Sequence, residues 1–218
     1  MINKMNIHEK INLAVELLKK EYPVCKCTLN YENDLQLLIA TRLAAQCTDA
    51  RVNIITPKLF KKYKNAKEFS EAKIENIQDI IKPCGFYKVK SLDIIEICKK
   101  IVDCFNGKVP NNIDDLTSLP GIGRKTANVL LAEIYKKDVV IVDTHFIRLT
   151  NRLGFHNMKD PVKIEFFMKD LLPQNESTNF CHRLVAHGRL ICTAIKPKCD
   201  SCCLKKICRF GNPESTNS

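Results

Sequence analysis

Four cysteines near the end of the chain have a spacing that could hold a metal centre. Cys192, Cys199, Cys202 and Cys208 form the pattern C-x6-C-x2-C-x5-C. Short loops between them let successive sulfurs turn toward one point, as both a four-cysteine zinc site and an iron–sulfur cluster require. The spacing leaves these two alternatives open. Cys203 follows Cys202 directly, so it is also open which of these two sulfurs would bind.

Basic side chains surround the four cysteines, against a single acid, Asp200. They are Arg189, Lys196, Lys198, Lys205, Lys206 and Arg209. They could balance the charge of an anionic cluster, contact phosphates, or form an ordinary solvated surface. The whole chain of 218 residues has a formal net charge of +11, which favours a polyanionic partner such as nucleic acid.

A glycine-containing string, Leu-Pro-Gly-Ile-Gly-Arg-Lys-Thr-Ala at residues 119–127, could bind a phosphate. Gly121 and Gly123 permit a tight turn and leave backbone amides uncovered at the start of the following helix. Such amides bind phosphate readily. The string is typical of a helix–hairpin–helix motif, which holds a nucleic-acid backbone without reading base sequence. We expect Gly121, Gly123 and Arg124 to contact DNA.

Lys125 stands in the first turn of that helix and could do chemistry. It could be a phosphate-binding or merely solvated lysine. It could also be an amine nucleophile that attacks a sugar carbon, which requires the neutral amine. The positive helix N-terminus and Arg124 both favour the neutral form. A nearby carboxylate would oppose them, so the sequence leaves this balance open.

A carboxylate follows a short apolar run at residues 138–143, in the string Val-Asp-Thr-His. Asp143 could simply cap the next helix. It could also stabilise a cationic transition state or assist a proton transfer. His145 could be a base, but a packed, hydrogen-bonded histidine is the commoner outcome.

Composition limits the classes of protein that remain. The hydrophobic fraction of 45% excludes a disordered chain, and no apolar run reaches the roughly 18 residues of a membrane span. The chain has 12 cysteines but no export signal at its start, so we expect a cytoplasmic protein, associated with the nucleoid if the source is bacterial. We also expect a monomer. The remaining cysteines, apart from the C-terminal cluster, are expected mainly in the core.

Helical spacing of apolar residues dominates the chain, so we predict an all-α fold. The expected helices lie near residues 8–20, 35–43, 50–63, 71–82, 88–105, 113–119, 124–136, 144–153, 160–172 and 177–191. Asn33 or Asp34 is expected to cap the second of them, and Asn111 or Asn112 the helix before the hairpin. The run at 138–143 is interpreted as a buried connector because it has no evident partner strand.

Taken together, these strings resemble the endonuclease III family of helix–hairpin–helix DNA glycosylases. Three separated segments carry the resemblance: Ala-Ala-Gln-Cys-Thr-Asp at 44–49, the hairpin 119–127 with 142–145, and His-Gly-Arg at 187–189 before the cysteines. The similarity extends from about residue 10 to about residue 210.

The resemblance implies two helical domains that flank a DNA-binding cleft. A six-helix barrel domain would span residues 27–137, and an iron–sulfur domain would combine residues 1–26 with 138–218. The family cluster is 4Fe-4S, and its ligands match Cys192, Cys199, Cys202 and Cys208. This match selects Cys202 over Cys203 and implies that the cluster holds a DNA-contacting loop.

The resemblance also implies removal of oxidised pyrimidines from double-stranded DNA, followed by strand cleavage at the abasic site. Lys125 matches the family nucleophile, which forms a Schiff base, and Asp143 matches the carboxylate that assists β-elimination. Gln46 matches a residue that enters the gap left by a flipped nucleotide. Phe86 falls where the family has an apolar wedge, with a core phenylalanine as the alternative. Arg189 is expected to contact DNA.

Three other functions fit parts of the sequence less well. An adenine-mismatch glycosylase usually lacks a lysine at position 125 and carries a further C-terminal domain, so Lys125 and the end at Ser218 argue against it. A non-catalytic, metal-stabilised DNA-binding module has no need of the Lys125–Asp143 pair. An electron-transfer protein has no need of a phosphate-binding hairpin or of the +11 charge.

Overall fold

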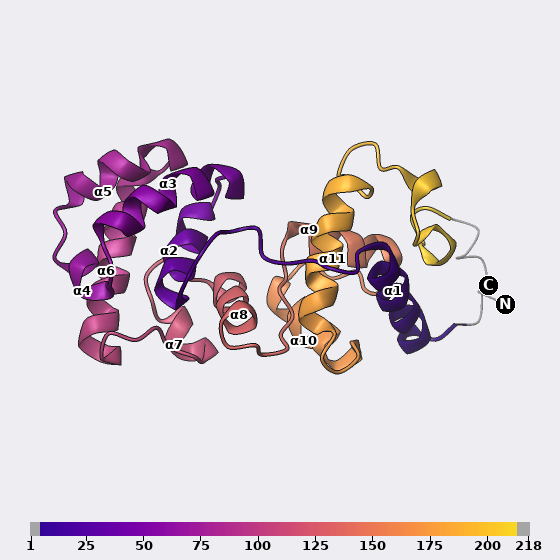
Figure 1. Cartoon of the computed structure of the whole chain (residues 1–218). Helices are drawn as coiled ribbons and strands as arrows, with labels where there is room; N and C mark the ends of the chain where they lie inside the picture. The colour runs from indigo at the N-terminus through magenta and orange to yellow at the C-terminus, as the bar shows by residue number, and fades with distance from the viewer. Residues whose placement is uncertain (1–4, 213–218) are drawn as a thin grey trace. The chain divides into compact units, whose positions relative to one another are not determined.

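The computed structural model describes residues 5–212, and every regular element in that range is helical. The predicted all-α class is therefore confirmed. The chain divides into two compact units (Figure 1). The terminal unit combines Met1–Cys27 with Asp138–Ser218, and the central unit is Thr28–Lys137. The central unit begins one residue later than the expected range of 27–137 and ends at the same residue.

The central unit is built around its longest helix, α6. Its elements are α2 (Asp34–Ala44), α3 (Asp49–Lys62), α4 (Ala66–Ser70), α5 (Ile74–Ile81), η2 (Lys82–Cys84), α6 (Tyr87–Phe105), α7 (Ile113–Thr117) and α8 (Arg124–Glu133). Helix α6 packs against α2, α4, α5 and η2. Its buried face carries Ile94, Ile97 and Ile101 at helical spacing. The unit thus has seven α-helices where the resemblance implied six, because the five-residue helix α4 lies between the helices expected near residues 50–63 and 71–82.

Asparagine side chains start three helices of the central unit. Asn33, Asn65 and Asn112 each accept a hydrogen bond from the backbone N–H three residues ahead, at 2.9, 3.0 and 2.9 Å. A cap of this kind satisfies one of the free N–H groups at a helix start and contributes about 1 kcal/mol. The caps predicted before α2 and α7 are therefore confirmed, and Asn33 and Asn112 are the residues that form them.

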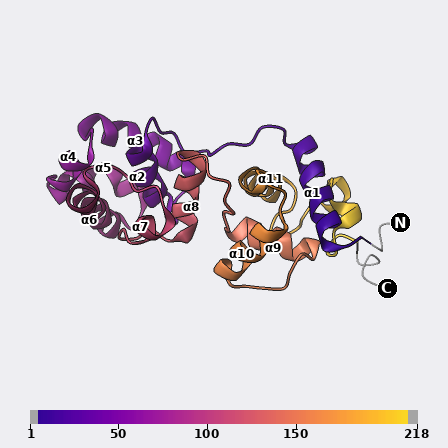
Figure 2. The ribbon, with the colours of Figure 1, turned by 90° about the horizontal axis from the view of Figure 1, so that it is seen from below.

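The terminal unit joins the two ends of the chain. Its elements are α1 (Ile7–Glu21), α9 (Thr144–Leu153), α10 (Pro161–Leu171), α11 (Ser177–Leu190), η3 (Cys199–Ser201) and η4 (Lys205–Ile207). Helix α1 lies beside α11 in Figures 1 and 2 and packs against it. In the core, Phe146 of α9 and Phe180 of α11 pack edge to face, with ring centroids 6.2 Å apart.

The run at 138–143 is a connector without strand structure, as predicted. Its polar groups find partners on and before α11. Asp138 accepts hydrogen bonds from Asn175 N at 2.9 Å and Ser177 Oγ at 3.0 Å, and Ile141 N donates to Cys181 Sγ at 3.2 Å. The connector needs no neighbouring strand because α11 satisfies its backbone.

Two further expectations can be compared with the structure. Outside the C-terminal cluster, Cys84, Cys98 and Cys181 are buried as expected, but Cys104 is exposed on the last turn of α6, and four others are half-buried: Cys25, Cys27, Cys47 and Cys203. The expectation that these cysteines lie mainly in the core is therefore wrong. No helix within residues 5–212 is long and apolar enough to cross a membrane.

Candidate functional site

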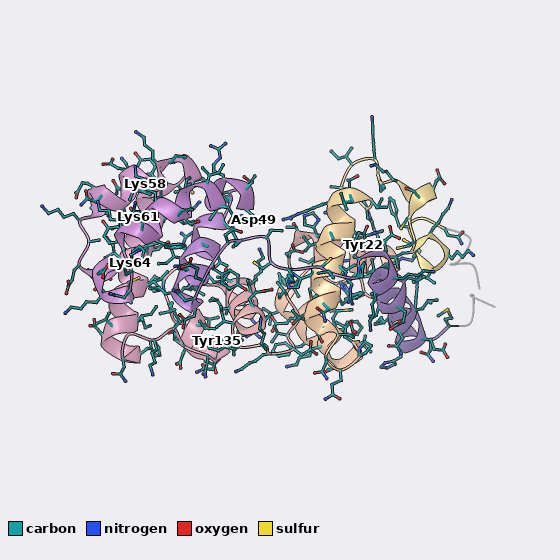
Figure 3. The ribbon with its side chains drawn as sticks, viewed as in Figure 1. Tyr22, Asp49, Lys58, Lys61, Lys64 and Tyr135 are labelled. Carbon is teal, nitrogen blue, oxygen red and sulfur yellow. The ribbon has the colours of Figure 1, made fainter. Side chains whose placement is uncertain are left out.

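The turn between α7 and α8 contains both buried and exposed residues. Leu119 and Ile122 are buried, whereas Gly121 and Gly123 are exposed. The Ile122 N–H closes the turn on Leu119 O at 3.2 Å. At the other end of α8, the Tyr135 hydroxyl donates to Val109 O at 2.8 Å (Figure 3). The two buried residues and this hydrogen bond hold the hairpin in place, while Gly121 and Gly123 remain exposed.

Gly121 needs to be glycine because the turn lies directly on an ion pair. Arg42 of α2 pairs with Asp93 of α6, and Arg42 Nε donates to Asp93 Oδ2 at 2.8 Å. A Cβ atom at Gly121 would lie 2.6 Å from Arg42 Nε and 2.9 Å from Asp93 Oδ2. Gly121 also has a φ of 68°, in the left-handed region that side chains disfavour.

Helix α8 begins without a side-chain cap. Its N-cap residue is Gly123, which has no side chain to offer, whereas asparagine caps α2 and α7. The first amides of α8 therefore point outward at the positive end of the helix dipole, where phosphate binds well. Arg124 is half-buried and Lys125 is exposed in this first turn. The predicted phosphate site and the predicted nucleophile thus share one helix start.

Gln46 and Phe86 occupy two exposed loops of the same unit. Both have left-handed backbone conformations, with φ of 54° and 47°. Phe86 is 66% exposed, so it is no core residue. Non-glycine residues with positive φ cost free energy and are concentrated at functional sites. This conformation supports the role that the sequence resemblance suggested for them.

In the terminal unit, Asp143 is the N-cap of α9. One carboxylate oxygen accepts from Phe146 N at 2.7 Å, and the side chain is half-buried. The capping role considered from the sequence is therefore confirmed. His145 is hydrogen-bonded to the Arg148 guanidinium, at 3.1 Å between Nδ1 and Nη2, in keeping with a packed histidine.

The four cysteines of the spaced cluster line one cavity. All four line the same small pocket, together with Pro197, Phe210 and Gly211. Cys202 belongs to this lining and its neighbour Cys203 does not. Of these two adjacent cysteines, Cys202 therefore lies beside the other three of the spaced cluster.

Hydrogen-bonding groups lie beside three of these sulfurs, and two of these groups are donors. Arg152 Nη1 donates to Cys192 Sγ at 3.2 Å, and Gly211 N donates to Cys208 Sγ at 3.4 Å. Cys202 Sγ lies 3.2 Å from His187 Nε2. Donors of this kind stabilise negative charge on sulfur, as in thiolate-bound metal centres.

The His187 contact extends to the N-terminal segment. Burial lowers the pKa of His187 to about 4, so the ring is neutral and carries one N–H. If Nε2–H donates to Cys202, Nδ1 accepts from the Tyr22 hydroxyl, 3.0 Å away (Figure 3). This chain connects the residue that ends α1 to the cysteine cavity.

Burial favours the thiol form of two cavity cysteines, Cys202 and Cys208, in the absence of a cation. Desolvation, followed by the neighbouring cysteines, raises the pKa of Cys202 to about 12, and burial also raises the pKa of Cys208. A bound cation would reverse this by stabilising the thiolates. Within residues 5–212, no three His, Cys, Asp or Glu side chains are arranged to hold a single metal ion.

Several basic residues near the cavity have exposed side chains. Lys205 pairs with Asp200 at 2.7 Å, and Arg209 donates to Asn157 Oδ1 at 2.9 Å. Arg189 and Lys196 are also exposed, at the end of α11 and in the following loop.

Two groups that support these features are not predicted from the sequence. The Arg42–Asp93 pair packs against Gly121 of the hairpin, and Lys90 of α6 is 1% exposed. A signal for Lys90 was present, because residues 90, 94, 97 and 101 follow the spacing of one buried helix face. No local pattern marks the pair, since its members are 51 residues apart.

Similar proteins place this arrangement in a family. The chain is 44% identical to endonuclease III of Synechocystis sp. over 193 residues. The aligned region covers 88% of each chain. It is 36% identical over 204 residues to endonuclease III of Bacillus subtilis, covering 93% of each chain.

Solved structures agree with these relatives. A non-covalent endonuclease III–DNA complex matches with a TM-score of 0.90 at 35% identity, covering 98% of this chain and 100% of that one. A trapped endonuclease III–DNA covalent intermediate matches with a TM-score of 0.91 at 36% identity, covering 96% and 99%. The family model described as HhH-GPD superfamily base excision DNA repair protein matches residues 39–174. The chain therefore belongs to the HhH-GPD superfamily of base excision DNA repair proteins.

Proposed function

We propose that this protein is a DNA glycosylase that removes oxidised pyrimidines from duplex DNA and then cleaves the strand as an abasic-site lyase. The observation that carries the proposal is the exposed Lys125 in the first turn of α8, beside the uncapped helix start. The amides of that turn would hold a DNA phosphate, and the lysine would then stand beside the adjacent sugar.

The proposed reaction proceeds through a covalent enzyme–DNA adduct. The damaged nucleotide leaves the stack, because C1′ is inaccessible inside the duplex. The neutral Lys125 amine attacks C1′, the glycosidic bond breaks, and the base leaves with its bonding electrons and accepts a proton. Loss of the amine proton and ring opening yield a Schiff base. A base then removes the C2′ proton, and the C3′–O bond breaks, so that the downstream strand leaves with a phosphate at its 5′ end.

Other residues receive supporting roles in this proposal. Asp143 would assist the sugar-centred steps as a carboxylate. Gln46 and Phe86 would fill the space left by the extruded nucleotide, as apolar and polar wedges do in bent duplexes. Arg124 and Arg189 would contact phosphates. The expected partner is therefore double-stranded DNA with a damaged pyrimidine or an abasic site.

We assign a 4Fe-4S cluster to Cys192, Cys199, Cys202 and Cys208. The assignment is supported by the shared cavity and by the hydrogen-bonding groups beside three sulfurs. When bound, the cluster would supply positive charge that keeps the thiolates ionised and would cross-link the C-terminal loop. Iron and inorganic sulfide in anaerobically purified protein test this. Stoichiometric zinc without iron would contradict it.

Excision and strand cleavage can be separated in one experiment. Duplexes carrying thymine glycol, 5-hydroxycytosine or an adenine–guanine mismatch are incubated with the protein, and base release and nicking are followed independently. We expect release and nicking on the two oxidised pyrimidines. Excision of the mismatched adenine alone would instead support an adenine-mismatch glycosylase. Binding without release would support a non-catalytic module.

A further inference from the structure

A buried lysine lies beneath the two exposed loops of the central unit. Lys90 stands in the first turn of α6 and is 1% exposed. Its ammonium donates to Leu43 O at 2.8 Å and to Cys84 O at 2.9 Å. Burial lowers the pKa of Lys90, because loss of hydration disfavours the charged ammonium.

The two carbonyls that Lys90 binds belong to helix ends next to the exposed loops. Leu43 lies in the last turn of α2, three residues before Gln46. Cys84 is the last residue of η2, two residues before Phe86. Carbonyls at helix ends lack intrahelical donors and carry partial negative charge, so a cation is well placed there. The Lys90 ammonium therefore binds carbonyls at the C-terminal ends of two helices, next to the start of each exposed loop.

A second contact joins the same loops. The thiols of Cys47 and Cys84 are close enough to interact, and burial, followed by the nearby Cys47, raises the pKa of Cys84 to about 11. Cys47 directly follows Gln46, and Cys84 is separated from Phe86 by Gly85 alone. The two residues with left-handed backbones are thus held by a common support.

A lysine is a costly way to fill this position. An ammonium group buried without a carboxylate loses its hydration, and an apolar side chain of similar length would fill the space at lower cost. The apolar face of α6 continues from this position through Ile94, Ile97 and Ile101. A methionine in place of Lys90 has no hydrogen-bond donor, so it could not bind the two carbonyls.

We propose that Lys90 is a positioning residue that fixes the Gln46 and Phe86 loops relative to each other, so that both side chains enter the duplex together around an extruded nucleotide. The inference rests on the proposed function, because it assumes that these two residues enter DNA. Lys90 itself touches neither substrate nor the reacting atoms.

The test uses the full-length protein with its metal centre and two substitutions in α6. Lys90→Met removes both carbonyl contacts and retains the apolar stem. Cys98→Ala is the matched control, because Cys98 is fully buried on the same helix but lies away from both loops. A duplex with 2-aminopurine opposite an abasic-site analogue reports base unstacking by a rise in fluorescence.

We expect Lys90→Met to lose most of the fluorescence rise at saturating protein. Its excision kcat/KM should fall roughly 10- to 100-fold, as for reacting groups misplaced by about 1 Å. Cys98→Ala should keep both signals. In a Gln46→Ala/Phe86→Ala background, adding Lys90→Met should change excision less than about threefold, because coupled residues are not additive. A general loss of stability would instead act equally in both backgrounds.

The outcomes separate this inference from the proposed function. If the wild-type protein releases no oxidised pyrimidine, the proposed function fails. If the wild-type protein is active and Lys90→Met retains the fluorescence rise, or its effect is undiminished in the double-mutant background, the positioning role is wrong. Should Lys90→Met fail to fold, Lys90→Gln is measured in the same cycle, and the same two results decide.

Discussion

Replacing Gly121 by alanine tests how the hairpin is held. The added methyl group meets two costs. A left-handed alanine costs about 1–2 kcal/mol, of which roughly 0.4–1 kcal/mol is returned because alanine stiffens the unfolded chain. In addition, the new Cβ would lie 2.6 Å from Arg42 Nε, so the guanidinium must leave its pairing with Asp93.

Gly107 supplies a matched control in the same unit. It has a similar φ of 76°, but nothing lies within 4 Å of its added Cβ. Gly107→Ala should therefore lower the free energy of unfolding by about 1 kcal/mol, the backbone cost alone. Losing the partly buried ion pair adds about 1 kcal/mol or more. We expect Gly121→Ala to lose about 2–3 kcal/mol in all.

Thermal unfolding measures both variants. About 1 kcal/mol corresponds to a fall of roughly 2–4 °C in Tm for a protein of this size, so Gly121→Ala should melt well below Gly107→Ala. Gly121→Ala should also bind abasic DNA more weakly, since its hairpin is displaced. If the two variants have the same Tm, the close packing of the hairpin on the ion pair is refuted.

Three further outcomes follow from the geometry. Gly123→Ala should keep its Tm, because nothing lies within 4 Å of the added Cβ, yet weaken DNA binding in a filter or anisotropy assay by crowding the α8 amides. Cys202→Ser should lower the iron content on metal analysis, whereas Cys203→Ser, outside the cavity lining, should leave it unchanged; the reverse would contradict the ligand assignment. DNA affinity should fall steeply as salt rises, since phosphate contacts release counterions. A salt-independent affinity would contradict the basic binding surface.

The long helices could be predicted from the sequence because apolar spacing and caps coincide. The one-turn helix α4 could not, since five residues hold too little periodicity to recognise. Helix α8 was expected to reach residue 136 but ends at Glu133. Lys136 adopts a left-handed φ of 52°, and the Lys137 N–H binds Leu131 O at 3.0 Å. A helix that ends in this way usually has a glycine at the left-handed position, and here that position is a lysine.

The residues that face outward at the site were easier to predict than those that support them. Lys125 and the glycines lie in one contiguous string, so their type and order are visible. Lys90 and the Arg42–Asp93 pair act through contacts between helices far apart in the sequence. A charged residue is normally assigned to the surface, so a buried lysine is recognised only once its carbonyl partners are located.

Borohydride trapping on abasic-site DNA tests the central claim most directly, because reduction converts a lysine Schiff base into a stable bond. The account predicts a covalent protein–DNA adduct whose modified peptide contains Lys125. Lys125→Ala should abolish that adduct, while Lys108→Ala, an exposed lysine outside the hairpin, should form it normally. No adduct with the wild-type protein, or an equal yield from Lys125→Ala, would contradict the assignment of Lys125 as the nucleophile.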